Sequence, residues 1–105
     1  MINACDELKV DLVLTSGGTG LGPRDVTPEA TRRVLQREVT GVSEALRMYG
    51  QKRTPLSMLS RGVAGIRGKT ILVNLSGSVK AVSESLDMLI PGITHASKML
   101  RGYGH

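Results

Sequence analysis

The sequence of 105 residues contains neither tryptophan nor phenylalanine, and its only aromatic residues are Tyr49 and Tyr103. A surface that stacks on RNA bases needs several aromatic side chains beside its basic groups. The net charge of +5 therefore indicates an anionic small ligand rather than a nucleic acid. A single cysteine, Cys5, cannot form an internal disulfide, which favours a reducing cytoplasm. The apolar runs are too short to span a bilayer, and the opening MINACDELKVD has no apolar segment typical of a secretory signal.

Apolar β-rich runs alternate with helical patterns along the chain. This order predicts one three-layer α/β/α domain over residues 1–105, with a mostly parallel sheet. Residues 10–15 are predicted to form a strand buried on both faces, and residues 70–75 a second strand. Thr27-Pro28-Glu29 predicts a helix start. Ser78 is predicted to cap a helix that runs to about Ile90, and Pro91-Gly92 to break it before a last helix.

Two loops that contain glycine follow the two strands. The first reads Ser16-Gly17-Gly18-Thr19-Gly20, and the second reads Ser76-Gly77-Ser78. Ligands of open α/β sheets bind beyond the carboxyl ends of strands, where loop N–H groups and helix N-termini attract phosphate. The loops therefore predict a phosphate or nucleotide site, with plain turns as the alternative. Neither loop has the spacing of a Walker A motif or of a dinucleotide-binding GxGxxG turn.

Four isolated polar residues are further candidates. Asp25 lies five residues after Gly20, and a carboxylate beside a phosphate site can hold Mg²⁺ together with the phosphate oxygens. The alternative is that Asp25 caps the helix that begins near Thr27, and the spacing does not separate the two interpretations. Asn74 stands at the end of an apolar strand beside the second loop. For Glu44, Ser60 and Asn74, a solvated or structurally hydrogen-bonded role is the default expectation, and Asn74 is the strongest candidate for a further role.

The stretch TSGGTG…PRDVTPEAT closely resembles the MoaB/Mog family of molybdenum cofactor biosynthesis, which includes the molybdopterin adenylyltransferases and the gephyrin G domain. The likeness continues through LSRGVAGIRGKTILVNL and PGITHASKMLRG, so it covers nearly the whole chain. Two families with the same fold carry other loops: GGVSxGxxD in the molybdenum insertase MoeA and GGLGPTxDD in the CinA group. Thr19 followed by PRDVTPEA favours MoaB/Mog over both.

The resemblance implies a three-layer α/β fold that is usually a homotrimer. It also implies an enzyme that joins molybdopterin to AMP, uses Mg-ATP, releases pyrophosphate and hands its product to a molybdenum insertase. By matching position, Thr19 and its glycines would lie against the pterin and its phosphate, and Asp25 would be an acidic residue linked to Mg²⁺. Ser60 and Asn74 match pocket residues, the loop 76–80 would border the pocket, and Glu44 matches less closely.

The chain departs from the family pattern in two places. Met1 falls inside the helix that should precede the strand at 10–15, so the chain corresponds to the C-terminal part of the family domain. The part of the family domain ahead of this point includes a second acidic residue linked to the metal, and without its first strands the sheet should have an exposed edge. Four explanations stay open: a fragment, a misassigned start, one part of a longer polypeptide, or a chain that folds with a partner supplying the rest. The family loop N-[LM]-P-G-[SN]-P is here Asn74-Leu75-Ser76-Gly77-Ser78-Val79, without either proline. These departures motivate the alternative of a non-catalytic protein that binds molybdopterin or forms oligomers.

Overall fold

The computed structural model describes residues 1–102, so Tyr103 lies outside the described residues. The elements in chain order are α1 (Ile2–Asp6), β1 (Leu12–Ser16), α2 (Thr27–Val34), β2 (Arg37–Glu38), α3 (Thr40–Gln51), the 3-10 helix η1 (Pro55–Leu59), β3 (Ala64–Arg67), β4 (Thr70–Leu75) and α4 (Val79–Leu100). Among these helices, none combines the length and the apolar character needed to cross a membrane.

The four strands form one sheet in the order β1-β4-β3-β2. The pairing is mixed rather than mostly parallel, because β1 runs parallel to β4 whereas β3 is antiparallel to both β4 and β2. A short turn at Gly68, whose φ is +60°, joins β3 to β4. Such a short connection allows only an antiparallel pair, since a parallel pair needs a crossover of a dozen or more residues.

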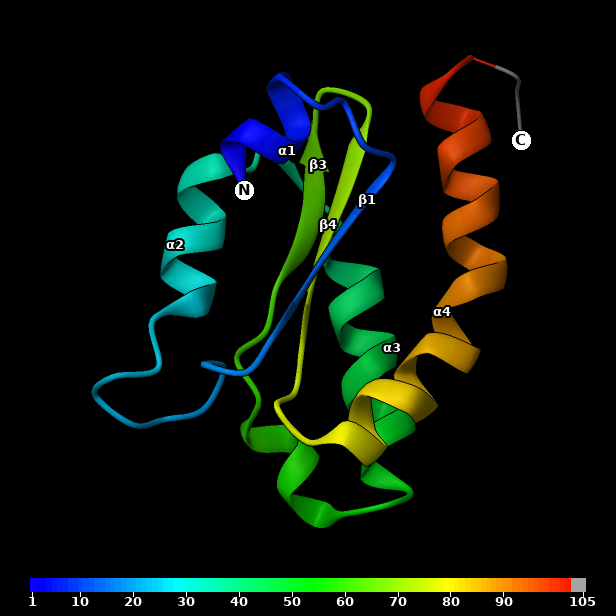
Figure 1. The fold of residues 1–105 in the computed structure, drawn as a ribbon. Coiled ribbons are helices and arrows are strands. Elements are labelled where there is room, and N and C mark those ends of the chain that lie inside the picture. Colours follow the sequence, from blue (N-terminus) through cyan, green and yellow to red (C-terminus); the bar gives the residue numbers. More distant parts are fainter. Residues whose placement is uncertain (103–105) are drawn as a thin grey trace.

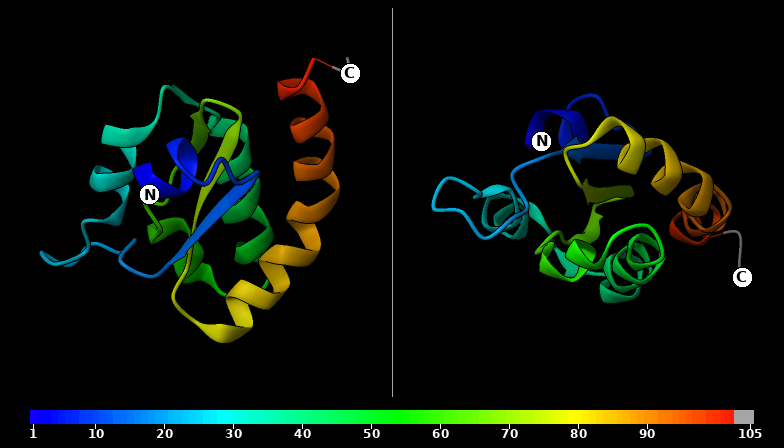
Figure 2. Two further views of the ribbon diagram at one scale, coloured as in Figure 1. Left: turned by 45° about the horizontal axis from the view of Figure 1, so that its top comes forward. Right: turned by 90° about the horizontal axis from the view of Figure 1, so that it is seen from below.

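Helices cover both faces of the sheet, which confirms the three-layer α/β/α class (Figures 1 and 2). Ile71, Val73 and Leu75 of β4 pack with Leu89 of α4 in the core cluster, to which α3 also contributes. On the other face, Asn74 of β4 is bonded to Thr31 of α2. Side chains alternate across a strand, so β4 anchors helices on both sides.

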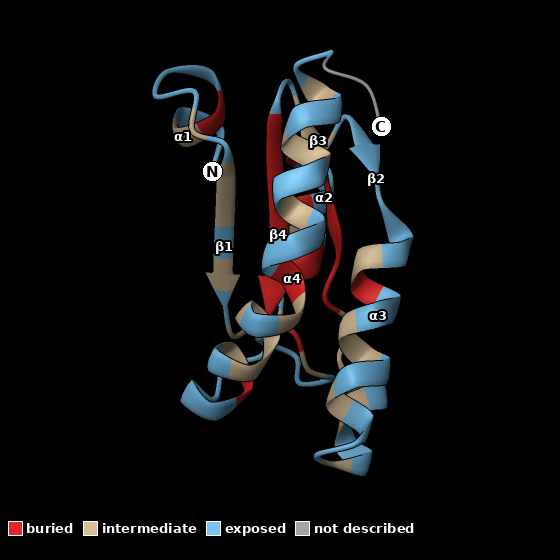
Figure 3. Cartoon of the chain, turned by 90° about the vertical axis from the view of Figure 1, so that its right-hand side faces the viewer, coloured by how far each residue is buried: buried red, intermediate tan, exposed pale blue. Residues whose placement is uncertain are grey.

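Strand β1 lies at the edge of the sheet, and the prediction that it is buried on both faces was wrong. The six residues of β4 are all buried, whereas β1 is only partly covered and Leu14 is 37% exposed (Figure 3). An edge strand has one neighbouring strand instead of two, so fewer side chains pack around it. The predicted exposed edge of the sheet is present at β1.

Helix α4 runs through Pro91 without a break, contrary to the prediction. It forms 22 continuous residues with Pro91 inside, and its axis changes direction between its first and second halves (Figure 1). Proline removes one backbone hydrogen bond and bends a helix, but it does not always end one. Leu89 before the proline and Ile93, Ala96 and Leu100 after it all pack on the sheet, and this burial holds both halves in place.

Candidate functional site

The two glycine loops meet at the carboxyl ends of β1 and β4. Because these strands are parallel neighbours, the loops leave the sheet at the same edge. The amide of Gly17 donates to the carbonyl of Leu75 at 2.9 Å. A Cβ atom added to Gly77 would lie 3.4 Å from the Cα atom of Gly17, so the backbones touch where no side chain intervenes.

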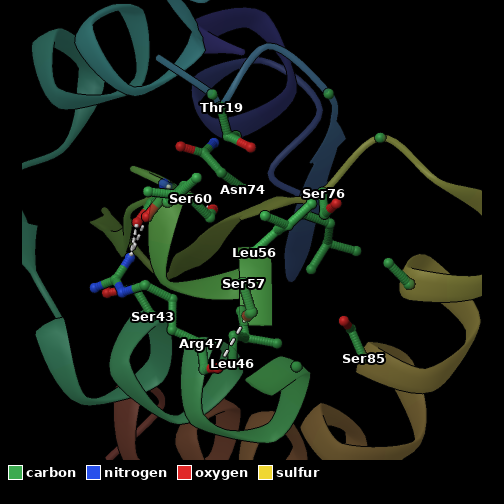
Figure 4. A pocket seen from close by; sticks show the side chains of 18 of the residues that line it. Thr19, Ser43, Leu46, Arg47, Leu56, Ser57, Ser60, Asn74, Ser76 and Ser85 are labelled. Atoms are coloured by element: carbon green, nitrogen blue, oxygen red, sulfur yellow. Dashed lines mark hydrogen bonds between the residues drawn. The ribbon is translucent and has the colours of Figure 1, made fainter. Parts of the chain in front are cut away.

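A cavity of about 660 Å³ opens beside the two loops. Figure 4 shows Thr19, Asn74 and Ser76 on its sheet side and Ser43, Leu46 and Ser85 on its helical side. Nine residues that the sequence singled out line this cavity: Gly17, Gly18, Thr19, Gly20, Asp25, Ser60, Asn74, Ser76 and Gly77. The structure therefore brings most of the predicted site residues together around one space.

Three predicted residues lie outside the lining of this cavity. Ser16 is exposed, and its hydroxyl donates to the carbonyl of Ser76 at 3.4 Å. The hydroxyl of Ser78 accepts the amide of Ala81 at 3.1 Å, so Ser78 is the N-cap of α4 as predicted. Glu44 lies on α3 beside a separate hollow of about 390 Å³. A ligand-binding role for these residues stays a prediction.

The sequence reasoning missed the helical wall of the cavity. Arg47 of α3 donates to the carbonyls of Ser60 at 3.3 Å and Gly62 at 3.0 Å, which fixes its guanidinium group. Arg53 forms an ion pair at 2.9 Å with Glu84 of α4. Further lining residues that were missed are Ser43, Leu46, Leu56, Ser57 and Ser85. Spacings of three and four residues put Ser43, Leu46 and Arg47 on one face of α3, and this signal could have shown that they act together.

The amide of Asn74 is occupied by contacts inside the protein. Its Nδ2 atom donates to the hydroxyls of Thr15 at 2.8 Å and Thr31 at 3.0 Å, and its Oδ1 atom accepts the amide of Val63 at 3.1 Å. Both amide hydrogens are therefore used, and only one lone pair of Oδ1 is left for a ligand. Asn74 joins β1, β4, α2 and the segment before β3, so its first role is to hold the walls of the cavity together.

Asp25 does not cap α2. The helix has Val26 at its N-cap position and no side-chain cap, and the amide of Thr27 instead donates to the carbonyl of Gly18 at 3.1 Å. The Oδ2 atom of Asp25 accepts the amide of Gly22 at 3.0 Å. A Cβ atom on Gly20 would lie 2.9 Å from this same oxygen. Asp25 therefore closes a turn of the glycine loop and stands at the cavity.

Arg61 crosses the outer side of the first glycine loop. Its guanidinium group pairs with the Glu29 carboxylate at 2.5 Å, and that hydrogen bond is the main cause of the lowered pKa of Glu29. The same hydrogen bond raises the pKa of Arg61 further above its usual range. A second pair of this kind joins Arg67 of β3 to Asp6 of α1 at 2.8 Å.

The charges around the cavity suit an anionic ligand. Arg47 and Arg53 line its helical wall, and within residues 1–102 Asp25 is the one acidic side chain in the lining. Glycine loops at the ends of neighbouring strands supply backbone N–H groups beside these cations. The fold and the site together define an α/β domain whose cavity, at the carboxyl ends of two parallel strands, is suited to an anion.

Comparison with known proteins identifies the family. Residues 2–95 match the family described as a probable molybdopterin binding domain. The chain belongs to this family, and within it to the MoaB/Mog group.

Relatives with known sequences agree with this assignment. Over 102 residues the chain is 43% identical to the molybdopterin adenylyltransferase of Helicobacter pylori strain J99, covering 97% of this chain and 58% of the relative. It is 44% identical over 96 residues to the molybdenum cofactor biosynthesis bifunctional protein of Chlorobaculum tepidum, covering 91% of this chain and 31% of the relative. The chain thus spans less than two thirds of these relatives.

Solved structures show the same fold. The molybdopterin biosynthesis enzyme MoaB from Thermus thermophilus superposes with a TM-score of 0.87 at 50% identity, covering 96% of this chain and 64% of that one. The Mog protein from Mycobacterium ulcerans superposes with a TM-score of 0.88 at 43% identity, covering 94% and 65%. The fold class expected from the sequence is therefore confirmed.

Proposed function

We propose that the cavity binds molybdopterin and that the chain acts in molybdenum cofactor biosynthesis, as a molybdopterin adenylyltransferase. In this reaction an oxygen of the terminal phosphate of molybdopterin attacks the α-phosphorus of ATP. A new P–O bond forms, the bond to the β-phosphate oxygen breaks, and pyrophosphate leaves. The observation that carries the proposal is the cavity itself, in which the glycine loop, Asp25 and two arginines surround one space in a chain of this family.

The residues of the cavity support this chemistry by binding and positioning. Backbone N–H groups of the loop 18–21 would hold a phosphate of the pterin. Arg47 and Arg53, on the opposite wall, would stabilise negative charge on the triphosphate. Leu46 and Leu56 offer apolar surface to the flat pterin ring. Phosphoryl chemistry of this kind needs positioning and charge neutralisation more than covalent participation by the protein.

Asp25 fits a magnesium ion that is held mainly by the substrates. Its Oδ2 atom is used by Gly22, whereas its Oδ1 atom has no hydrogen-bond partner within residues 1–102. Mg²⁺ commonly binds one or two carboxylates together with substrate phosphates and water. We therefore propose that Asp25 is the protein ligand. When bound, Mg²⁺ would neutralise charge on the transferred phosphate.

A second candidate function is binding without catalysis. Across residues 1–102 no group of three histidine, cysteine or acidic side chains could hold a metal ion, and Asp25 is the single acid of the cavity. A chain with one such carboxylate could bind molybdopterin tightly and still leave adenylyl transfer to a longer protein.

The substitution Asp25→Asn tests the proposal and separates the two candidates. We expect ATP-dependent adenylylation of molybdopterin to fall by about 100-fold or more, the scale of losing a central electrostatic group. Molybdopterin affinity should change little, since the amide keeps the shape of the carboxylate. Asp87→Asn, an exposed carboxylate on α4, is the control and should leave both quantities unchanged. Full activity in Asp25→Asn would exclude the metal role, and tight binding without turnover by the unsubstituted chain would favour the binding function.

We also propose that residues 1–105 form one molybdopterin-binding domain, that it assembles as a homotrimer, and that a molybdenum insertase receives its product. Exposed apolar side chains on neighbouring elements support an assembly, since Met48 of α3 and Met58 of η1 are each about 70% exposed. Native mass spectrometry should show three copies of the chain, and a monomer at micromolar concentration would contradict the trimer.

A further inference from the structure

Arg61 makes an unusual number of contacts with the first glycine loop. Its backbone amide donates to the carbonyl of Thr19 at 2.8 Å, and its Nε atom donates to the carbonyl of Gly20 at 2.8 Å. A terminal guanidinium nitrogen donates to the carbonyl of Asp25, and the other pairs with Glu29. Arg61 thus holds both ends of the segment 19–25 through hydrogen bonds to the carbonyl oxygens of that segment.

These contacts fix the direction in which the loop amides point. Residues 1–102 contain no cis peptide bond, and in a trans peptide the C=O and the following N–H point in opposite directions. The carbonyls of Thr19 and Gly20 are held toward Arg61, so the N–H groups of Gly20 and Leu21 point away from it. Gly20 and Leu21 line the cavity, whereas Arg61 lies outside its lining.

The amides of this segment are free to bind a ligand. Within the described residues, the N–H groups of Gly18, Thr19, Gly20 and Leu21 donate to no backbone or side-chain acceptor, although those of Gly17 and Gly22 on either side do. Gly17 and Gly18 have φ angles of +89° and +71°, a conformation in which successive N–H groups can converge. Four consecutive unpaired amides therefore follow a left-handed turn at the wall of the cavity.

We propose that Arg61 is the positioning residue of this site: by holding the loop carbonyls from outside, it turns the amides of Gly20 and Leu21 into the cavity to bind a phosphate group. The inference rests on the proposed function only for the identity of the phosphorylated ligand. The orientation of the amides follows from the contacts of Arg61 alone.

The main-chain amide of Arg61 holds the Thr19 carbonyl, whereas the guanidinium group holds the Gly20 carbonyl and so orients the Leu21 amide. The guanidinium group is required for this second contact because its donors point in several fixed directions. It reaches the carbonyls of Gly20 and Asp25 and the Glu29 carboxylate at the same time. A lysine has the same charge, but its ammonium group cannot match the planar arrangement. Arg61→Lys therefore separates positioning from charge.

Arg67 provides a matched control in the same chain. Its guanidinium group binds both oxygens of Asp6, at 3.1 and 2.8 Å, and donates to the carbonyl of Val34 at 3.0 Å. Replacing it removes a similar set of bonds outside the lining of the cavity. Replacing either arginine alone would leave its acidic partner unpaired. The charge-balanced double variants Arg61→Gln/Glu29→Gln and Arg67→Gln/Asp6→Asn are therefore compared with each other.

The test is a titration of the full chain with inorganic phosphate, followed by amide NMR. In the unsubstituted protein, the amide signals of Gly18 to Leu21 should shift on binding. Arg61→Lys and Arg61→Gln/Glu29→Gln should weaken phosphate binding about tenfold or more, the scale of losing oriented hydrogen bonds to a charged group. In the presence of phosphate they should also speed hydrogen exchange of the Leu21 amide, whose orientation depends on the guanidinium group, while Arg67→Gln/Asp6→Asn stays within about twofold of the unsubstituted protein.

The outcomes distinguish this inference from the proposed function. Unchanged phosphate affinity and amide shifts in the Arg61 variants would overturn it, and so would an absence of shifts in the unsubstituted chain, even if that chain binds molybdopterin. If phosphate shifts the amides and the Arg61 variants lose this response, the inference is supported. That support holds even if molybdopterin fails to bind, in which case only the proposed function is lost.

Discussion

The buried amide of Asn74 offers the sharpest test of how the cavity walls are held together. Asn74→Ala removes the acceptor of the Val63 amide and both donors to Thr15 and Thr31. Val63 is 2% exposed, so its N–H group would lose its partner in a site that water reaches poorly. An orphaned buried donor costs about 1–3 kcal/mol, and each further lost bond about 0.5–1.5 kcal/mol. The hydroxyl of Thr31 still donates to the carbonyl of Thr27, which limits the loss there.

We therefore expect Asn74→Ala to lower the free energy of unfolding by about 3 kcal/mol. The assay is urea unfolding at one fixed protein concentration. The slope of the free energy of unfolding against urea concentration is compared between variants, because equal slopes show that the denatured states match. Gln36→Ala is the control, because the Gln36 side chain also accepts a backbone amide, that of Gly68 at 2.8 Å, but on the exposed surface. It should cost no more than about 1 kcal/mol.

A double-mutant cycle between Asn74→Ala and Thr31→Val isolates one contact of the network. The two side chains touch, so their effects should be non-additive by about 1 kcal/mol. A loss below about 0.5 kcal/mol in Asn74→Ala, or additive effects in the cycle, would refute the structural role. Asn74 would then be free to act mainly as a ligand contact.

Two further predictions concern stability. Val79 is the first residue of α4 and follows Ser78, whose backbone is extended. Val79→Pro should therefore raise the free energy of unfolding by about 0.4–1 kcal/mol, measured in urea. As a control, Ser83→Pro inside α4 should lower the free energy of unfolding by about 3 kcal/mol. The hydrogen bonds from Arg61 and Arg67 lower the pKa of Glu29 and Asp6 in the folded protein. These two pairs therefore stabilise the folded state above about pH 4, and the stabilisation is lost as the pH falls through the lowered pKa values of the two carboxylates. Urea midpoints between pH 7 and pH 3 should fall less steeply in Glu29→Gln, and an identical slope would contradict this pairing.

Features with a local signal could be predicted from the sequence. The strand at 70–75 was predicted with its observed bounds, and Ser78 caps α4 as its sequence position predicted. The meeting of the two glycine loops followed from the rule that parallel strands end at one edge of the sheet. These predictions depended on residues close together in sequence, or on one general property of sheets.

The remaining features depend on contacts between distant residues. Glycine is typical of turns, but Gly65 lies inside β3, where an added Cβ atom would meet the carbonyl of Arg37 at 2.4 Å. Glycine is needed at this position because the backbone of β2 approaches closely, and not because the chain turns there. Arg47 and Arg53 were missed because most arginines lie on the surface, and only the packing of α3 against η1 and α4 makes them part of the cavity.

The order of strands in the sheet has a consequence for how the protein folds. Strands β3 and β4 are joined by a short turn, so their pairing closes a small loop and can form early. The parallel pairing of β1 with β4 brings together residues as distant as Ser16 and Ser76, 60 positions apart. Closing so long a loop is entropically costly and slow. We therefore expect the cavity to form in the last stage of folding, when β1 docks and its glycine loop arrives beside the second one.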